Sequence, residues 1–233
     1  VKKEFTQSRI LTGDFYYENF KDYKQIIISP GVSVRSELFS SLEAHGCFLL
    51  GDIELFAQVV AKPVIAITGS NGKSTVTTLV EKMAQDCGAK AVAGGNLGIP
   101  ALDLLASKSD LYILELSSFQ LETTYSLKTV SAVVLNVSED HMDRYSSLDD
   151  YRQVKERIYQ YTDNAVLNRH EPITLQRLLK VRDKAIAAGK ETAELIFFSA
   201  ESNQELFANN GFKLKGQFNQ LNISAALALL QPL

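Results

Sequence analysis

The chain has 233 residues, of which 45% are apolar and 22% charged, and its net charge is −3. This composition excludes general disorder, and the weakly acidic charge argues against non-specific binding to nucleic acid or to anionic membranes. Cys47 and Cys87 are the only cysteines, which excludes a disulfide scaffold and favours a reduced, cytoplasmic compartment. The longest apolar run falls short of the roughly 18 residues that a membrane span needs.

Strand-like and helix-like patterns alternate along the chain. Strands are expected over residues 25–29, 47–50, 63–68, 89–93, 111–116, 130–137, 164–167 and 195–199. Helices are expected over residues 36–45, 53–60, 73–87, 100–106, 148–159, 173–188 and 219–230, with Asp52 as a cap for the second. The near-continuous apolar run at 63–68 suits a parallel strand that is covered on both faces. We therefore predict an α/β fold with a mostly parallel sheet and flanking helices.

The strongest local motif lies between the strand at 63–68 and the next helix, where the chain reads Thr-Gly-Ser-Asn-Gly-Lys-Ser-Thr. Small residues let backbone N–H groups surround phosphate oxygens, and the helix start adds its positive dipole end. The lysine can reach the β- and γ-phosphates, and the following serine hydroxyl can ligate Mg²⁺. The expected ATP-binding residues are Gly69, Ser70, Asn71, Gly72, Lys73, Ser74 and Thr75.

This motif departs from the usual phosphate loop. Two residues separate Gly69 from Gly72 instead of four, and Ile67 stands where the first glycine would be. We therefore interpret it as a variant P-loop. The alternative is a glycine turn beside a solvated lysine.

Polar residues follow several later strands, at the edge where parallel sheets bind ligands. Glu115 is a candidate Mg²⁺ ligand, because this cation prefers oxygen atoms, although a strand-end salt bridge would also explain it. His141 follows a buried strand within an acidic cluster and is a candidate functional residue, although a lone histidine is often structural. By composition alone, Lys155 reads as a solvated helix lysine and Asn219 as a helix-start residue that could act as a cap.

Several segments, in this order, resemble the Mur ligase family. They are SPGV at 29–32, GDIELF at 51–56, ITGSNGKSTVTTLV at 67–80, GGNLGIPAL at 94–102, ELSSFQLE at 115–122, LNVSEDHMDRY at 135–145 and YRQVKERIY at 151–159. ELSSFQLE and EDHMDRY resemble the D-glutamate-adding members more than their sister ligases or folylpolyglutamate synthase. The resemblance covers most of the chain and is weakest between residues 169 and 211.

The resemblance implies an ATP-dependent ligase of peptidoglycan precursor synthesis. ATP would activate the carboxylate of UDP-N-acetylmuramoyl-L-alanine as an acyl phosphate, and D-glutamate would attack it to form an amide. Lys73 and two Mg²⁺ ions would screen the approach of the two anions. We expect a cytoplasmic monomer that binds neither nucleic acid nor membrane.

The resemblance also assigns site residues. Ser74 and Glu115 would hold one Mg²⁺, and His141 the second. Lys155 would be carbamylated by CO₂, which converts a cation into an anion able to help position the metal. The expected substrate contacts are Ser29, Pro30 and Gly31 toward uridine diphosphate, and Asn96, Ser117 and His141 toward the muramoyl group. Asn219 would lie near the adenine, although Phe218 stands where the family often has histidine.

The domain organisation follows from the same resemblance. Residues 1–51 would form part of an N-terminal, UDP-binding, Rossmann-like domain, and residues 52–233 the central ATP-binding domain. The start of the first domain and a C-terminal domain would lie outside this sequence, so we expect the chain alone to lack ligase turnover. The alternatives are an isolated Mg-ATP-binding module and another ligase of the Mur or folylpolyglutamate type. A generic P-loop kinase is disfavoured by the shortened loop.

Overall fold

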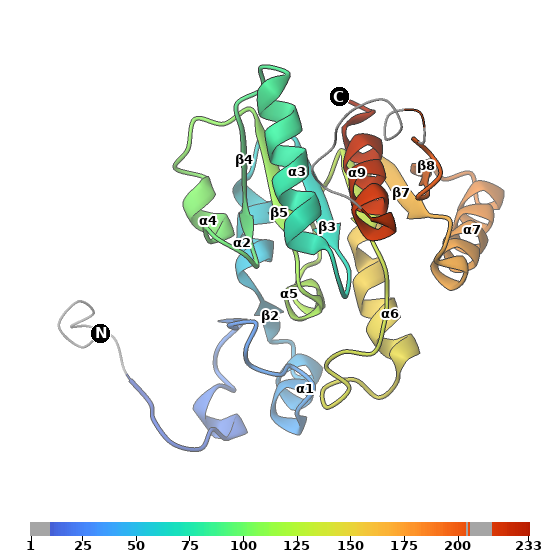
Figure 1. Ribbon diagram of the computed structural model, residues 1–233. Coiled ribbons are helices and arrows are strands. Elements are labelled where there is room, and N and C mark those ends of the chain that lie inside the picture. The colour runs from blue at the N-terminus through green and yellow to red at the C-terminus, as the bar shows by residue number, and fades with distance from the viewer. Residues whose placement is uncertain (1–9, 204, 206–215) are drawn as a thin grey trace.

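The computed structural model describes residues 10–203, 205 and 216–233, and it confirms the predicted α/β fold. Within these residues, six parallel strands form the main sheet in the order β4-β5-β3-β6-β7-β8 (Figure 1). They are β3 (Val64–Thr68), β4 (Ala91–Gly95), β5 (Leu111–Glu115), β6 (Ser131–Val134), β7 (Asn164–Asn168) and β8 (Glu194–Phe198). Strand β3 lies between β5 and β6, so the loop after it occupies the middle of the carboxyl edge.

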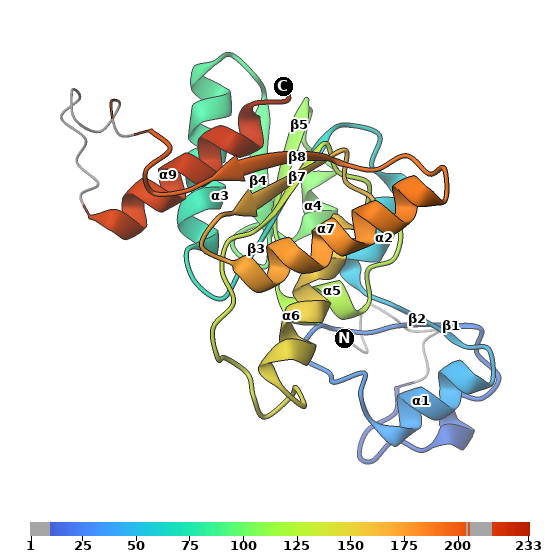
Figure 2. The ribbon, with the colours of Figure 1, turned by 90° about the vertical axis from the view of Figure 1, so that its right-hand side faces the viewer.

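Helices cover both faces of this sheet, as Figures 1 and 2 show. On one face, α3 (Lys73–Asp86) and α9 (Gln217–Leu230) pack side by side. The other face carries α2 (Asp52–Val59), α4 (Ala101–Leu104), α5 (Ser118–Glu122), α6 (Leu148–Glu156), the 3-10 turn η2 (Arg157–Tyr159) and α7 (Pro172–Ala187). Each helix in the described part of the chain is too short or too polar to cross a bilayer.

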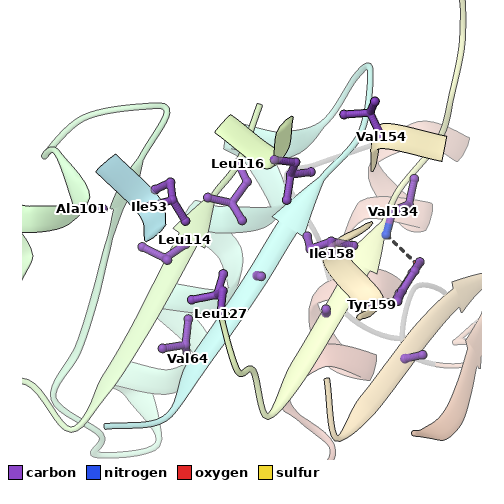
Figure 3. Packing of buried hydrophobic residues seen from close by; sticks show 14 of the residues in the cluster. Ile53, Val64, Ala101, Leu114, Leu116, Leu127, Val134, Val154, Ile158 and Tyr159 are labelled. Carbon is purple, nitrogen blue, oxygen red and sulfur yellow. Dashed lines mark hydrogen bonds between the residues drawn. The ribbon is translucent and has the colours of Figure 1, made fainter. Parts of the chain in front are cut away.

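The two faces of the sheet support two hydrophobic cores. Because successive strand residues point to opposite faces, Val64 and Ala66 of β3 join one core while Ile65 and Ile67 join the other. Figure 3 shows the first core, in which α2, η2 and the strands pack together. The buried Tyr159 hydroxyl accepts a hydrogen bond from the Val134 amide at 2.7 Å and donates to the Val166 carbonyl at 2.9 Å. This polar group is therefore satisfied inside the core.

A second, two-stranded parallel sheet precedes the main one and lies below it in Figures 1 and 2. It consists of β1 (Gln25–Ile27) and β2 (Phe48–Leu50), with α1 (Glu37–Ala44) and the 3-10 turn η1 (Tyr17–Asn19) beside it. Its core is separate and contains Ile28, Leu42, Cys47 and Leu49.

Some element boundaries differ from the sequence expectation. Helix α5 forms where no helix was expected. The Ser117 hydroxyl accepts a hydrogen bond from the backbone N–H of Gln120, and the Gln120 side chain accepts one from the backbone N–H of Ser117. The expected Asp52 cap is wrong: Gly51 is the N-cap residue of α2, and Asp52 Oδ2 instead accepts from Gln120 Nε2 at 3.1 Å. Strand β4 begins two residues later than expected, and β6 ends at Val134.

Candidate active site

The phosphate-loop motif lies between β3 and α3, as the sequence predicted. Gly72 is the N-cap residue of α3 and has φ +85°, a left-handed conformation that glycine adopts without strain. The first turn of α3 therefore begins at Lys73, with its free N–H groups at the loop. Ser74 and Thr75 are exposed on this first turn. The loop thus has the backbone geometry of an anion site.

Asn136 and Ser138, which follow β6, hold the phosphate loop in place. The Asn136 carbonyl accepts from the Ser70 amide at 3.0 Å, and its side chain exchanges two 2.9 Å hydrogen bonds with the backbone of Asn71. The Ser70 hydroxyl donates to the Ser138 carbonyl at 3.0 Å and accepts from the Ser138 amide at the same distance. The sequence expectation that polar groups after β6 converge on the phosphate loop is therefore confirmed.

Lys73 is half-buried, and its side chain folds back over the loop. Its Nζ donates to the Gly69 carbonyl at 2.9 Å and to the Ser70 carbonyl at 3.1 Å. The ammonium group therefore lies over the loop, where it can pair with phosphate oxygens.

Glu115 ends β5 directly beside the phosphate loop. The sheet register pairs it with Ile67 of β3 and with Gly95 of β4, and the residue is 2% exposed. Asn96 Nδ2 donates to its Oε1 at 2.8 Å, while its buried Oε2 has no hydrogen-bond partner among the described residues. A buried carboxylate oxygen without a partner is costly, so this atom fits a cation.

The described residues contain no cluster of three or more His, Cys, Asp or Glu side chains placed to hold a metal. Mg²⁺ does not require one, because it commonly binds to one or two carboxylates, with water and substrate phosphates completing its shell. Glu115, at the end of β5, and the Ser74 hydroxyl, in the first turn of α3, are compatible with that mode.

Lys155 is 1% exposed, so the interpretation from composition alone, a solvated lysine, is wrong. The α6 residue points inward: its Nζ donates to the Gly69 carbonyl at 3.0 Å and lies 4.5 Å from the centre of the Tyr151 ring. Burial lowers the pKa of Lys155 to about 7, and the positive charge of Lys73 acts in the same direction. The composition of its helix hides this placement, because most of its side chains are charged or carry amides, although Tyr151, Arg152 and Val154 are buried beside Lys155.

His141 lies in the loop after β6 with φ +54°, which is uncommon for a residue other than glycine. Its ring packs 4.8 Å from Phe119, and its Nε2 lies 3.6 Å from Asp140 Oδ2. Within the described residues, no hydrogen bond joins it to Glu115 or Lys155. Phe119 belongs to α5, two residues after Ser117, so His141 and Ser117 share one neighbourhood.

Helix α9, which packs beside α3, reaches the phosphate loop. Asn219 is in its first turn rather than at its cap, which is Gly216. A methyl group added at Gly72 would lie 2.8 Å from Asn222 Oδ1, so Asn222, which the sequence reasoning missed, contacts the loop. Asn219 and Asn222 are three residues apart and so share one face of the helix, a spacing that could have revealed the second asparagine as a site residue. Phe218 is 86% exposed at the start of this helix.

The Ser29–Gly31 segment follows β1, some distance along the chain from the other candidates. Arg144, in the loop after β6, donates to the carbonyls of Pro30 at 3.1 Å and Val32 at 3.2 Å. Arg35 and Arg144 both pair with Glu122, and Arg35 also forms a two-pronged pair with Asp150. We call Arg35, Glu122, Arg144 and Asp150 the arginine junction. The sequence reasoning missed it, and its separations of up to 115 residues leave no local signal.

We call the phosphate loop, Glu115 and Lys155 the strand-end site.

A family comparison matches residues 67–230, which include this site, to the Mur ligase middle domain. The chain is 46% identical over 227 residues to the UDP-N-acetylmuramoylalanine--D-glutamate ligase of Pasteurella multocida, and it is 44% identical over 233 residues to that of Aliivibrio salmonicida. These alignments cover 94% and 96% of this chain and 52% of each relative. The chain therefore spans about half the length of the curated relatives it matches.

Solved structures share the fold at lower identity. A UDP-N-acetylmuramate:L-alanyl-gamma-D-glutamyl-meso-diaminopimelate ligase from Neisseria meningitides aligns with a TM-score of 0.58 and 15% identity, over 93% of this chain and 77% of that one. A UDP-N-acetylmuramoyl-L-alanyl-D-glutamate--2,6-diaminopimelate ligase aligns with a TM-score of 0.57 and 16% identity, over 97% and 62% of the two chains. At these identities the likeness concerns the fold alone.

Proposed function

The chain belongs to the Mur ligase family, and on that premise we propose that it is the nucleotide-binding part of a ligase that joins D-glutamate to UDP-N-acetylmuramoyl-L-alanine with consumption of ATP. Such a reaction belongs to the assembly of peptidoglycan precursors. The observation that carries the proposal is the buried Glu115 oxygen beside a phosphate loop, which lacks a hydrogen-bond partner among the described residues. The names of the relatives support the choice of amino acid and acceptor.

We propose two units with separate tasks. Residues 1–51, which hold the small sheet and its own core, would contact the uridine diphosphate through Ser29, Pro30 and Gly31. Residues 52–233, with the main sheet, would bind ATP. We further propose a monomer in the cytoplasm, where the two free cysteines, Cys47 and Cys87, stay reduced.

The proposed reaction begins when the substrate carboxylate attacks the γ-phosphorus of ATP, giving an acyl phosphate and ADP. The amine of D-glutamate then attacks the acyl carbon, loses a proton, and releases inorganic phosphate as the amide forms. In the first step, the positive charge of Lys73 would reduce the electrostatic repulsion between the substrate carboxylate and the γ-phosphate. Asn96 and Ser117 would orient the muramoyl group, and Asn219 would lie near the adenine.

Bound Mg²⁺ would neutralise phosphate charge and orient the nucleotide. We assign Glu115 and Ser74 to the ATP-side ion and His141 to a second ion. We also propose that Lys155 is carbamylated: its neutral amine would add to CO₂, lose one proton and become a carbamate anion. The support is its burial against the phosphate loop, where a permanent second ammonium would repel both Lys73 and a metal.

An assay of phosphate release tests the ligase. We expect release by the ligase that contains these residues to require ATP, UDP-N-acetylmuramoyl-L-alanine and D-glutamate together. Lys73→Ala and Glu115→Ala should abolish it without unfolding the protein, whereas Lys82→Ala, an exposed lysine of the same helix as Lys73, should not. Lys155→Ala should also inactivate, and added bicarbonate should not restore activity. Acceptance of meso-diaminopimelate in place of D-glutamate would contradict the assignment.

The alternative is a module that binds Mg-ATP without catalysing ligation. Calorimetry with Mg-ATP on the 233-residue chain, next to the same phosphate assay, separates the two. Binding without turnover is the expected result for this chain, and turnover by it would contradict the module interpretation.

A further inference from the structure

Arg144 contacts both the Ser29–Val32 turn and the neighbourhood of His141. Its Nη1 donates to the Pro30 carbonyl, and its Nη2 donates to the carbonyl of Val32. These partners lie 114 and 112 residues away along the chain. Two N–H groups of the planar Arg144 guanidinium therefore fix the position of the turn that follows β1 of the two-stranded sheet.

Glu122 holds the guanidinium in this position. Its Oε2 accepts from Arg144 Nη2 at 2.8 Å, while its Oε1 pairs with Arg35 from the first unit. The Glu122 side chain is 5% exposed and that of Arg144 is 9% exposed, so water screens this pair little. The buried Arg144 Nε has no hydrogen-bond partner in the described part of the chain. The guanidinium group is therefore oriented so that its Nη atoms form hydrogen bonds while Nε forms none.

The flat face of the same guanidinium packs on Phe119. Its Cζ lies 3.8 Å from the centre of that ring, and the ring lies 4.8 Å from the ring of His141. Phe119 belongs to α5, whose N-cap residue is Ser117. One side chain therefore links the turn after β1 with two residues on the muramoyl side of the proposed site.

We propose that Arg144 is a positioning residue that sets the uridine diphosphate turn at Ser29–Val32 relative to His141 and Ser117. This proposal rests on the proposed function, because it requires that turn to contact the uridine diphosphate. The phosphate loop is held separately, by Asn136 and Ser138, so the effect of Arg144 is confined to the uridine side.

Calorimetry with two probes, uridine diphosphate and Mg-ADP, tests the proposal on the 233-residue chain. We expect Arg144→Met to weaken uridine diphosphate binding by about tenfold or more and Mg-ADP binding by less than about twofold. Arg144→Lys should fall between wild type and Arg144→Met, because it keeps the charge but loses the fork. Hydrogen exchange should become faster in residues 29–34 of Arg144→Met and stay unchanged in residues 67–76.

Arg157→Met is the matched control. Arg157 also donates to a backbone carbonyl, that of Thr124 at 3.0 Å, and lies 5.3 Å from the Tyr125 ring, both far along the chain from the Ser29–Val32 turn. It should leave both affinities within about twofold of wild type.

The outcomes separate the two proposals. If wild type binds both probes and Arg144→Met binds them equally well, or if both affinities fall together, the role of Arg144 is overturned. Faster exchange at 29–34 with unchanged uridine diphosphate affinity overturns it as well, because the contact is then merely structural. If wild type binds Mg-ADP but not uridine diphosphate, the proposed uridine contact is wrong and the positioning role falls with it.

Discussion

The strand-end site and the arginine junction are built in opposite ways. In the strand-end site, the backbone register of β3, β4 and β5 places Glu115 beside Ile67 and Gly95. In the arginine junction, side chains 87 and 115 residues apart meet as ion pairs. Backbone geometry is determined by strand and loop motifs, whereas such pairs depend on how the elements around the two sheets pack together. We therefore expect the first region to be sensitive to steric changes and the second to changes in charge.

The largest effect is expected from Gly95→Ala, at the β4 residue that pairs with Glu115 of the strand-end site. Gly95 has φ +105°, and an added Cβ would lie 2.5 Å from the Glu115 carbonyl oxygen. The backbone strain costs about 1–3 kcal/mol, and the clash adds to it, so we expect a loss of about 3 kcal/mol or more in the free energy of unfolding. Urea denaturation measures this.

Gly98→Ala is the control for that prediction. Gly98 also has a positive φ, +75°, but an added Cβ meets open space. Its loss should be about 1–2 kcal/mol, from backbone strain alone. Equal losses for the two variants would show that the register of β4 and β5 relaxes easily, contrary to our comparison.

The next effect is expected from Glu122→Gln in the arginine junction. The substitution keeps the shape of the side chain but leaves the guanidinium groups of Arg35 and Arg144 without their shared anion. Breaking a buried pair costs about 3–5 kcal/mol, and because Arg35 is partly exposed we expect a loss of about 2–3 kcal/mol. Glu37→Gln, at an exposed position of α1, should change the unfolding free energy by less than about 1 kcal/mol. A double-mutant cycle with Arg144→Met should show coupling, and additive losses would contradict it.

Lys155 sharpens the comparison, because it belongs to the strand-end site although it lies 86 residues along the chain from Gly69 of the phosphate loop. Its pKa is about 7 in the folded protein, against 10.5 for an ordinary lysine side chain, so the unfolded chain binds the additional proton between these values. Stability should therefore rise with pH in this window, by up to about 1.4 kcal/mol per pH unit. Urea denaturation from about pH 7 to 9, in buffer free of CO₂, should show this slope in wild type. Lys155→Met should reduce it, and equal slopes would contradict the burial of a neutral amine.

The same contrast explains how far the sequence alone could lead. The α/β fold, the main sheet and the position of the phosphate loop were predictable, because apolar runs and glycine motifs act over short distances. Helix α5 was missed because its cap depends on the reciprocal bonds of Ser117 and Gln120. Composition alone gave Lys155 as solvated, and only the family resemblance placed it at the site, because a helix rich in polar residues can still bury some of them. Arg35 and Arg144 show no pattern in the sequence, because their partners are far away along the chain.

The smallest effect is expected from Asp150→Asn, and it tests whether exclusion of water or hydrogen-bond geometry determines the strength of the junction. Asp150 pairs with Arg35 at 2.6 and 3.0 Å, which is better geometry than many surface pairs have. The two side chains are 25% and 33% exposed, however, so solvent screens them, and we expect a loss below about 1 kcal/mol.

The pH dependence of this pair follows from the same contact. The hydrogen bond from Arg35 lowers the pKa of Asp150 from 3.8 to about 2, although partial burial opposes the shift. Its contribution should be complete above about pH 4 and lost as the pH falls through about 2, where the variant and wild type should converge. Glu122 and Asp150 share Arg35 as a partner, but Glu122 is less exposed and also pairs with Arg144. A loss for Asp150→Asn as large as that for Glu122→Gln would therefore mean that hydrogen-bond geometry, and not exclusion of water, determines the strength of the junction.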